Sequence, residues 1–322
     1  MGIATRLLYI LLLVLVAGPA RPAPSLPRLD AVKVSPHVYY FRGEAGMASQ
    51  NNRGFMSNAG FVLTPAGVVV FDALATPALG AAMLDAIRKV TAQPVRTIIV
   101  SHYHADHFYG LQALRTGGAS IWAHHNARAT LQSDFTLSRL AERRASLAPW
   151  VDLNTRLVPA DRWLDLGSDK VLRFELGGMR FSVIGAAGAH SQEDLMLLAE
   201  DDRVLFAGDL FFSGRLPFVG EADSKAWLLA LDKINSSRPL VVIPGHGAAS
   251  TDPLADLSLT RSYLVFLREQ MGKAVAEMMT FDEAYKAVDW SRFEKYPAFN
   301  EANRLNAYGT YLLMERESLA KP

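Results

Sequence analysis

The stretch Ser101-His102-Tyr103-His104-Ala105-Asp106-His107 decides how this sequence folds and which chemistry it can support. It follows the apolar run 95–100 directly, and such a run is typical of a buried strand. Alternate histidines at the end of a strand point the same way, and the turn brings Asp106 and His107 round from another side. Three imidazoles and one carboxylate within six residues suit a metal ion such as zinc, which accepts nitrogen and oxygen donors. A polar loop without a metal is the competing interpretation, and this density of ligand-type residues argues against it.

Three further ligand-type residues, His190, Asp209 and His246, stand where strands are expected to end. Each follows a buried apolar run and lies close to a glycine, which lets backbone and side chains crowd a small site. Any one of them alone is a weak signal. Together with the first cluster they bring the number of ligands to seven, which is enough for two metal ions.

The composition is compatible with a metal site of this kind. The chain has 322 residues, of which 50% are hydrophobic and 20% charged, as in a globular protein. It contains no cysteine, so any metal ion must be held by nitrogen and oxygen ligands. With 33 basic and 32 acidic residues it has no electrostatic footprint for nucleic acid, and we expect a small-molecule substrate. The sequence does not specify an oligomeric state.

Strands and helices alternate in a similar way in the two halves of the chain. The first half has a helix that begins after Thr76, and its strands are expected at 38–41, 61–63, 68–71 and 95–100. The second half has a helix from Asp223, and its strands are expected at 171–175, 181–185, 195–199, 204–207 and 240–243. Beyond residue 252 the chain is expected to be helical, with a last helix at 301–319. Two such halves predict two packed sheets with helices outside.

The order of these motifs resembles that of the metallo-β-lactamase superfamily. The resemblance runs from residue 38 to at least residue 247, and it rests on the 102–107 motif, His190, Gly208-Asp209 and Pro244-Gly245-His246-Gly247. It implies an α/β (α+β) fold, the four-layer αββα sandwich of that superfamily, with the metal ions at one edge of the two sheets. It further implies a metal-dependent hydrolase with two Zn²⁺ ions per chain.

The same resemblance implies a role for each ligand-type residue. It places His102, His104 and His190 on the first zinc ion, and Asp106, His107 and His246 on the second, with Asp209 bridging the pair. It also implies that Asp72, after the run 68–71, supports the metal loop from behind. A turn or helix-capping aspartate is the competing interpretation of Asp72.

The expected mechanism follows from two metal ions about 3.5–4 Å apart. A bridging water loses a proton, and the resulting hydroxide attacks a carbonyl that the first metal polarises while the second steadies the leaving group. Asp106 is the expected catalytic residue, because it can orient the hydroxide. The expected scissile bond is an ester, thioester, lactone or lactam bond.

A closer likeness is to exported zinc metallohydrolases associated with sulfur-oxidation and quinoprotein systems. It rests on Gly208-Asp209-Leu210-Phe211-Phe212, on Arg215-Leu216-Pro217, and on the segments around 296–297 and 303–311. True β-lactamases of the superfamily usually carry cysteine or serine at the position of Asp209. Two alternatives stay open: a sulfur dioxygenase of the same superfamily with one Fe²⁺, and a non-catalytic exported binding protein. The complete ligand set argues against both.

Substrate contacts are predicted close to the ligands in sequence. A flexible lid over an apolar group is expected from Met47, Phe55 and Met56. Further lining residues are expected to be Tyr109, Phe211, Phe212 and Arg215. Ordinary packing is the competing interpretation for each of them. Three other histidines, His37, His124 and His125, are surplus to the ligand set and are interpreted as supporting or surface residues.

The first residues predict export. Arg6 precedes an apolar run from 7 to about 17, and small residues follow near Ala20, as in a secretory signal peptide. A membrane anchor would need about 20 apolar residues, and this run is shorter, so no stable membrane span is expected. We therefore expect cleavage near Ala20 and a periplasmic or secreted protein. The expected parts are a signal peptide (1–20), a hydrolase domain (21–250) and a C-terminal helical extension packed on it (251–322).

Overall fold

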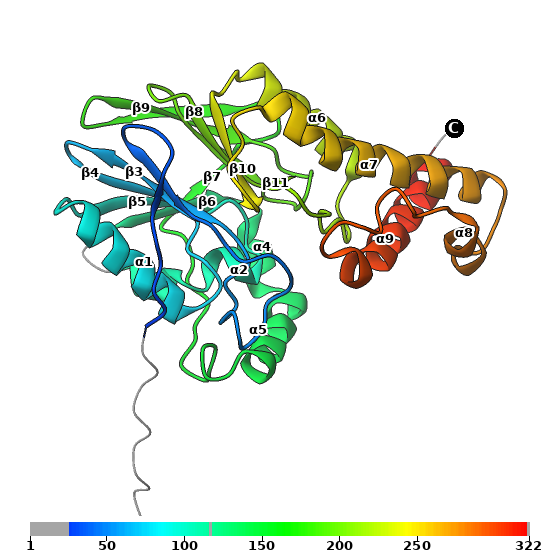
Figure 1. The fold of residues 1–322 in the computed structure, drawn as a ribbon, viewed down its shortest axis with the longest axis horizontal. Helices are drawn as coiled ribbons and strands as arrows, with labels where there is room; N and C mark the ends of the chain where they lie inside the picture. The colour runs from blue at the N-terminus through cyan, green and yellow to red at the C-terminus, as the bar shows by residue number, and fades with distance from the viewer. Residues whose placement is uncertain (1–25, 116–117, 321–322) are drawn as a thin grey trace, which may run out of the picture.

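Two β-sheets packed against each other form the centre of the molecule (Figure 1). The computed structural model describes residues 26–115 and 118–320, so the expected signal peptide lies outside the described residues. The first sheet has the order β1-β2-β3-β4-β5-β6-β7, with strands at Val32–Lys33, Val38–Phe41, Ala59–Thr64, Gly67–Phe71, Val95–Ile99, Ser120–His124 and Arg162–Leu164. The second has the order β12-β11-β10-β9-β8, with β8 to β12 at Val171–Leu176, Met179–Gly185, Leu195–Ala199, Val204–Phe212 and Val241–His246.

Helices cover the outer face of each sheet. Those of the first half are α1 to α5, at Pro77–Val90, Ala105–Phe108, Leu111–Leu114, Ala127–Gln132 and Asp134–Ser146. Those of the second half are α6 to α9, at Ser224–Ser236, Pro253–Ala276, Phe281–Ala287 and Phe299–Leu319. Three hydrophobic clusters fill the spaces between the layers. One lies between the first sheet and its helices, one between the two sheets, and one between the second sheet and its helices. The predicted αββα sandwich with C-terminal helices is confirmed.

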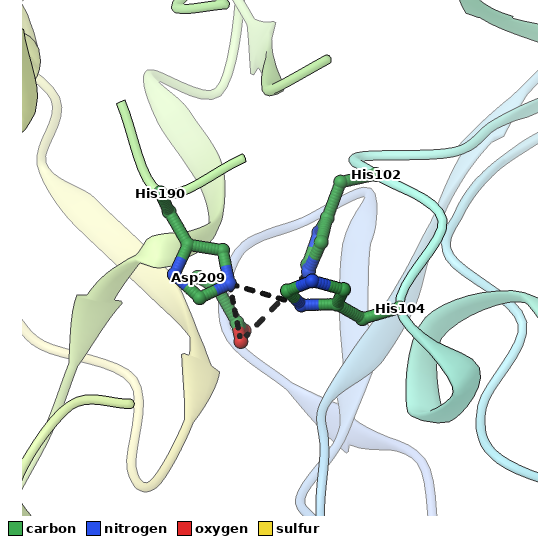
Figure 2. A group of neighbouring side chains, drawn as sticks. All are labelled: His102, His104, His190 and Asp209. Carbon is green, nitrogen blue, oxygen red and sulfur yellow. Dashed lines mark hydrogen bonds and ion pairs between the residues drawn. The ribbon is translucent and has the colours of Figure 1, made fainter. Parts of the chain in front are cut away.

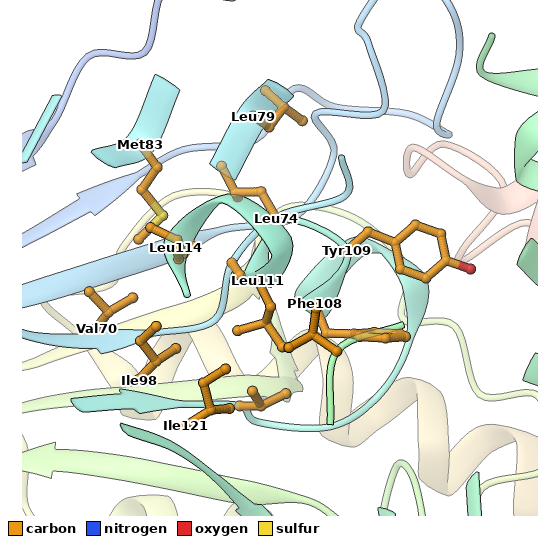
Figure 3. Packing of buried hydrophobic residues seen from close by; sticks show 14 of the residues in the cluster. Val70, Leu74, Leu79, Met83, Ile98, Phe108, Tyr109, Leu111, Leu114 and Ile121 are labelled. Carbon is orange, nitrogen blue, oxygen red and sulfur yellow. The ribbon is translucent and has the colours of Figure 1, made fainter. Parts of the chain in front are cut away.

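Strand β4 shows how the sequence produces these layers. Val68 and Val70 pack into the cluster beneath the helices, whereas Val69 and Phe71 pack between the sheets. Successive side chains of a strand point to opposite faces, and here both faces are covered, so the whole strand is apolar. Figure 3 shows Val70 together with Ile98 and Ile121 of the neighbouring strands, packed against side chains of α1 and α3.

Local signals fix the first residue of several helices. The Thr76 hydroxyl accepts a hydrogen bond from the Leu79 amide (3.1 Å), and Pro77 occupies the first turn of α1, as predicted. Asp223 caps α6 by accepting hydrogen bonds from the amides of residues 225 and 226 (2.9 and 3.0 Å). Residues that cap helices are recognisable in sequence because they form hydrogen bonds with amides only two or three residues further along the chain.

One predicted strand end is wrong. The sequence predicts a strand that stops at Ala207, but β11 continues to Phe212 and carries Asp209 within it. The pairing of β11 with β12 shifts in register between Phe206 and Gly208, and Gly208 has a φ of +53°. Such a bulge redirects the following side chain without ending the strand. His246 is likewise the last residue of β12 rather than a residue beyond it.

Of the C-terminal helices, α7 packs on β11 of the second sheet, and α9 packs on α7 and on a loop that follows β11. Within the described residues, no helix is long and apolar enough to cross a membrane. Buried Asn306 of α9 donates to the Pro217 carbonyl (2.8 Å) and accepts from the Val219 amide (2.8 Å). Tyr263 of α7 joins this network, since its hydroxyl accepts from Asn306 (3.1 Å) and donates to Asn303 (2.8 Å). The extension therefore holds the 216–220 loop in place.

Replacing Gly309 with alanine is expected to destabilise the protein by about 1–3 kcal/mol, the usual range for overpacking. A Cβ atom at Gly309 would lie 1.8 Å from the carbonyl oxygen of Gly220, so α9 or the loop must move. Gly272→Ala in α7 is the matched control, because its Cβ would meet no atom closer than 3.5 Å. Alanine there should stabilise the helix by about 0.5–1 kcal/mol. Urea unfolding of both variants measures this, and equal effects would contradict the packing of α9 on the loop.

Candidate metal centre

Seven side chains from the two halves of the chain lie together at one edge of the sheets. They form two groups in which the potential ligand atoms all lie within 4.8 Å of one another. The first group is His102, His104, His190 and Asp209, and the second is Asp106, His107 and His246. These are the same two sets that the resemblance assigns to two ions, with Asp209 placed in the first group. Figure 2 shows that the first group converges from opposite sides of the sandwich.

The first cluster owes its geometry to the end of β5. The strand ends at Ile99, and residues 101–104, which belong to no strand or helix, lead into the short helix α2 (Ala105–Phe108). His102 and His104 project from this segment, whereas Asp106 and His107 belong to the helix. One short segment thus supplies ligands to both groups. His190, by contrast, comes from the loop between β9 and β10.

Asp209 lies between the two groups and directs one oxygen atom at each. Its Oδ2 lies 3.5 Å from His190 Nε2 and 3.9 Å from His102 Nε2. Its Oδ1 lies 3.1 Å from His107 Nε2 and 3.4 Å from His246 Nε2. A carboxylate in this position can bind two metal ions at once, one through each oxygen atom.

Asp106 completes the second group. Its Oδ2 lies 3.3 Å from His246 Nε2 and 3.5 Å from His107 Nε2. Its side chain is 20% exposed, whereas those of His107 and His246 are buried. Asp106 is therefore the carboxylate of this group that solvent or a substrate can reach.

The donor atoms fit a metal ion because several of them have no hydrogen-bond partner. Buried atoms without one include His102 Nε2, His107 Nε2 and Asp209 Oδ1, all directed at this centre. Buried polar atoms in folded proteins nearly always have a partner, since leaving one unpaired costs about 1–3 kcal/mol. Imidazole nitrogen and carboxylate oxygen are donors that zinc accepts. The residues present therefore fit a metal centre.

Burial controls the charge of the first group. It lowers the pKa of His102 well below the ordinary value, with further lowering from the neighbouring imidazoles of His104 and His107. Burial also lowers the pKa of His104, although Asp106 partly offsets it. The pKa of His190 falls to about 3, again mainly because of burial. These imidazoles are neutral at pH 7, and the neutral form is the one that binds metals.

Charge pairing dominates the second group. Burial alone would raise the pKa of Asp209, but the imidazoles of His246 and His107 outweigh it and hold that pKa well below the ordinary value. The pKa of Asp106 is lowered for the same reason. In return, the carboxylates raise the pKa of His107 and His246 despite their burial. The two ionised carboxylates are thus paired with imidazoles that hold protons, and metal cations would take the place of those protons.

Asp72 supports this centre from behind. Its Oδ1 accepts from the Ser101 amide (2.7 Å), and its Oδ2 accepts from the Ser101 hydroxyl and from His107 Nδ1 (2.8 Å each). The Ser101 hydroxyl in turn lies 2.9 Å from His102 Nδ1. Asp72 has a φ of +61°, and Thr76 rather than Asp72 caps the following helix. One buried carboxylate thus orients ligands of both groups.

Two glycines leave room for the ligands. A Cβ at Gly245 would lie 1.9 Å from Asp209 Oδ1, and one at Gly208 would lie 2.9 Å from the Ser101 Cβ. No other residue fits either position without displacing the centre. The glycines beside the ligands in sequence are therefore part of the construction of the site.

Asn58 is a supporting residue that the sequence does not reveal. It is buried, and its Nδ2 donates to the carbonyls of Pro244 and Gly247 (2.8 and 2.9 Å), on either side of His246. His246 Nδ1 donates to the Met56 carbonyl (2.8 Å), which orients the ring. These contacts join segments nearly 190 residues apart in the sequence, so no local pattern could predict them.

A cavity of about 230 Å³ opens beside the ligands and includes atoms of Asp106, Asp209 and His246 in its lining. Of the residues predicted to contact substrate, those that line it are Met47, Met56, Tyr109, Phe212 and Arg215. We call this cavity the pocket. Because it opens onto the potential metal ligands, the pocket is the candidate substrate site.

Two predicted contact residues lie elsewhere. Phe55 is half-buried and packs against the cluster between the first sheet and its helices. Phe211 is fully buried in the cluster beneath the C-terminal helices. Neighbouring side chains of a strand point to opposite faces, so Phe211 points away from the face that carries Phe212 into the pocket.

The sequence does not identify several walls of the pocket. Phe135, Arg139 and Arg143 come from α5, and Phe218 comes from the loop after β11. Helix α9 adds Glu301 and Leu305. Contacts of this kind depend on how distant helices pack, which local patterns do not encode.

The surplus histidines lie outside the centre. His124 is buried and contacts the Leu166 carbonyl through Nε2 (3.0 Å). His37 pairs with Asp202 (2.8 Å), and His125 lies 3.6 Å from Asp165. None of the three belongs to either ligand group.

Comparison with known proteins agrees with this description. Residues 52–246 match the family described as the metallo-β-lactamase superfamily. A linear primary-alkylsulfatase of Pseudomonas sp. is 22% identical over 260 residues, which cover 70% of this chain and 48% of that protein. A metallo-β-lactamase of Chryseobacterium indologenes is 21% identical over 220 residues, covering 67% of this chain and 80% of that protein. This chain thus spans about half the length of the alkylsulfatase.

Solved structures show the same fold. A sec-alkylsulfatase of Pseudomonas sp. superposes with a TM-score of 0.65 at 18% identity and covers 91% of this chain and 52% of that one. A metallo-β-lactamase of Pontibacter korlensis has a TM-score of 0.55 at 22% identity and covers 74% of this chain and 99% of that one. A match over 91% must reach beyond residue 250, since the residues up to 250 are less than four fifths of the 322. The fold likeness to the alkylsulfatase therefore extends into the C-terminal helices.

Proposed function

This chain belongs to the metallo-β-lactamase superfamily, and from that premise we propose that it is a dinuclear zinc hydrolase of ester, thioester, lactone or lactam bonds. The observation that carries the proposal is the position of Asp209, whose two oxygens face two different groups of ligands. A site built for one ion has no need of such a carboxylate. The relatives named above are hydrolases, and the His/Asp centre makes a metal-dependent reaction the corresponding chemistry here.

The ligand groups define which residues would hold each ion. One ion would be held by His102, His104 and His190, the other by Asp106, His107 and His246, and both by Asp209. Zinc ions in these positions would supply Lewis-acid polarisation of a substrate oxygen and would lower the pKa of a bound water. No cysteine or serine nucleophile is needed for hydrolysis of this kind, which accords with a chain that lacks cysteine.

The residues of the chain prepare the centre for this reaction. His107 Nδ1 donates to Asp72 and His246 Nδ1 donates to the Met56 carbonyl, so both rings direct Nε2 at the centre. Asp106 is ionised and partly exposed in the pocket, which suits it to accept a hydrogen bond from a water molecule and to orient the attacking oxygen.

Sulfate ester hydrolysis is the second candidate. Two observations favour it: the fold likeness to a sec-alkylsulfatase includes C-terminal helices, and the pocket is lined by the arginines Arg139, Arg143 and Arg215. Guanidinium groups match the geometry of oxyanions. The same metal centre would serve either bond.

The test of the proposed function combines metal analysis with a substrate panel. Purified full-length chain is analysed for metal by mass spectrometry and assayed with a chromogenic lactam, a thioester, a lactone and an alkyl sulfate. Two zinc ions per chain with turnover of one of the first three supports the leading proposal, and turnover of the sulfate alone supports the second candidate. One iron ion with persulfide-dependent oxygen uptake would replace both, and a metal-free, inert protein would indicate a binding function.

Removing the metal ions with a chelator is expected to lower the midpoint of thermal unfolding. Without them, Asp209 and the imidazoles around it keep buried atoms unpaired. A ligand at 100 times its Kd stabilises the folded state by about 2.7 kcal/mol, and each ion should contribute on this order. Calorimetry before chelation, after it and after zinc is restored measures the effect. A His102→Gln variant is the control and should gain less from zinc, whereas an unchanged midpoint would count against a metal centre.

A further inference from the structure

Arg215 is a buried cation with an unused hydrogen-bond donor in the pocket. The residue is 5% exposed, and its Nη1 donates to the Gly46 carbonyl (3.1 Å). Its Nε is buried and has no hydrogen-bond partner among residues 26–115 and 118–320. Burial lowers the pKa of Arg215, and Asp209 offsets this only in part, but an arginine guanidinium still carries its charge at pH 7. A buried charge with a free N–H group is costly unless a ligand completes its hydrogen bonds.

Tyr109 offers a second unused donor in the same pocket. Its ring packs with Phe108 in the cluster under the first sheet, and its hydroxyl points out of that cluster (Figure 3). The hydroxyl oxygen is buried, and no described residue forms a hydrogen bond with it. A tyrosine hydroxyl carries its proton at pH 7 and can therefore donate a hydrogen bond. Two residues that line one pocket thus each carry a donor for which the described part of the chain supplies no acceptor.

The charges around the pocket favour an anion as that acceptor. Its cationic lining residues are Arg139, Arg143 and Arg215, and its acidic ones are Asp106, Asp209 and Glu301. Oxygens of Asp106 and Asp209 are directed at imidazoles 3.1–3.5 Å away, which leaves Glu301 as the acidic group at the mouth. Arg139 is partly engaged by Glu142 (2.7 Å), and Arg215 has the carbonyl contact described above. Metal ions at the centre would add further positive charge.

The mouth of the pocket is apolar. Four large side chains there are exposed, namely Met47 (42%), Phe135 (61%), Phe218 (38%) and Leu305 (56%). They come from separate segments of the chain, yet all line one opening. Exposed apolar side chains gathered around one pocket indicate an apolar ligand surface rather than isolated surface residues.

We propose that the pocket selects amphiphilic organic anions, with Arg215 and Tyr109 binding a sulfate or carboxylate group and the apolar mouth binding a hydrocarbon tail. The inference rests on the proposed function in taking the pocket as the substrate site, and it names the class of substrate. Planar guanidinium groups bind both oxyanions through paired N–H donors, which is why the two head groups share this chemistry. The tail would lie between α5 and α9, where Phe135 and Leu305 face the opening.

Binding of probes that cannot be hydrolysed tests this proposal. Calorimetric titration of the zinc-loaded, full-length chain uses octyl sulfonate, nonanoate and the neutral methyl octyl sulfone, all below their micelle concentrations. At least one anion should bind about tenfold more tightly than the sulfone, and the better of the two identifies the head group. Arg215→Gln should weaken anion binding by about 30-fold or more, as expected when one partner of a buried charge pair is removed. Arg88→Gln, an exposed arginine on α1, is the matched control and should change nothing.

Two gentler variants keep the test valid if Arg215→Gln unfolds. Tyr109→Phe removes only an unpaired hydroxyl and should reduce anion affinity by about twofold to tenfold, the usual range for one hydrogen bond. Phe135→Ser changes an exposed side chain and should weaken every octyl probe while leaving binding of methyl sulfonate unchanged. Equal affinity for sulfone and anions, or full anion preference in a folded Arg215→Gln variant, would overturn the proposal. If the protein binds two zinc ions and hydrolyses a substrate but shows no preference for anions, only this inference is overturned. If it prefers anions but hydrolyses none of the substrates, only the proposed function is overturned.

Discussion

Asp209→Asn is expected to reduce hydrolysis on the order of a thousandfold, because loss of metal-centred stabilisation costs several kcal/mol in the transition state. The two oxygens of Asp209 face different ligand groups, and asparagine offers only one oxygen and no charge. The zinc content should fall from two ions per chain to one or fewer. Metal analysis and steady-state kinetics on the substrate that the wild-type protein hydrolyses measure both effects.

The control for this substitution is Asp165→Asn, which removes an exposed carboxylate far from the centre. It should leave both the metal content and the rate unchanged. Circular dichroism distinguishes a lost ion from a lost fold, since the asparagine side chain is close to aspartate in size. An Asp209→Asn protein that holds two zinc ions and keeps the full rate would exclude the bridging role.

Asp72→Ala is expected to destabilise the metal-free protein by about 3–5 kcal/mol, the range for removing one partner of a buried pair. Three buried donors lose their acceptor: the Ser101 amide, the Ser101 hydroxyl and His107 Nδ1. Alanine must also adopt a φ of +61°, which L side chains rarely do. Zinc affinity should fall by about 10–100-fold, because His107 loses the carboxylate that orients it. Urea unfolding and competition with a chromophoric chelator provide the two measurements.

Asp72→Asn separates the two effects of that substitution. Asparagine tolerates positive φ better than alanine, and its oxygen can still accept from the Ser101 amide. It should therefore recover much of the stability while zinc affinity stays low. Asp85→Ala on the exposed face of α1 is the control for the loss of a carboxylate. Zinc affinity equal to wild type in Asp72→Ala would show that His107 is oriented without it.

The fold was predictable because its signals are local and repeated. Strand β4 is apolar throughout because both of its faces are covered, and Thr76 with Pro77 marks the start of α1. The first ligand cluster was predictable for the same reason, since residues 102–107 lie on one strand end and one turn. The more distant His190, Asp209 and His246 needed the order of motifs along the chain, because nothing local connects them to the first cluster.

The features that escaped prediction depend on packing between distant segments. Strand β11 runs through Asp209 because its pairing with β12 resumes after the bulge, and the sequence of β11 alone does not contain that register. Asn58 lies in a polar loop and is recognisable only by its bonds to the chain around His246. The pocket walls from α5 and α9 follow from how helices outside the ligand motifs pack. Phe211 was misplaced because adjacent strand residues point to opposite faces.

The contrast between the glycines at the centre and the exposed mouth determines how such a protein can evolve. A side chain at Gly245 or Gly208 would displace Asp209 or Ser101, so we expect substitutions at these two positions to disrupt the metal centre. Phe135, Phe218 and Leu305 are exposed, and changes at exposed positions usually alter stability by less than about 0.5 kcal/mol. Reaction and specificity are therefore separately mutable in this chain. We expect substitutions at the mouth of the pocket to change which substrates bind, while the residues of the metal centre stay the same.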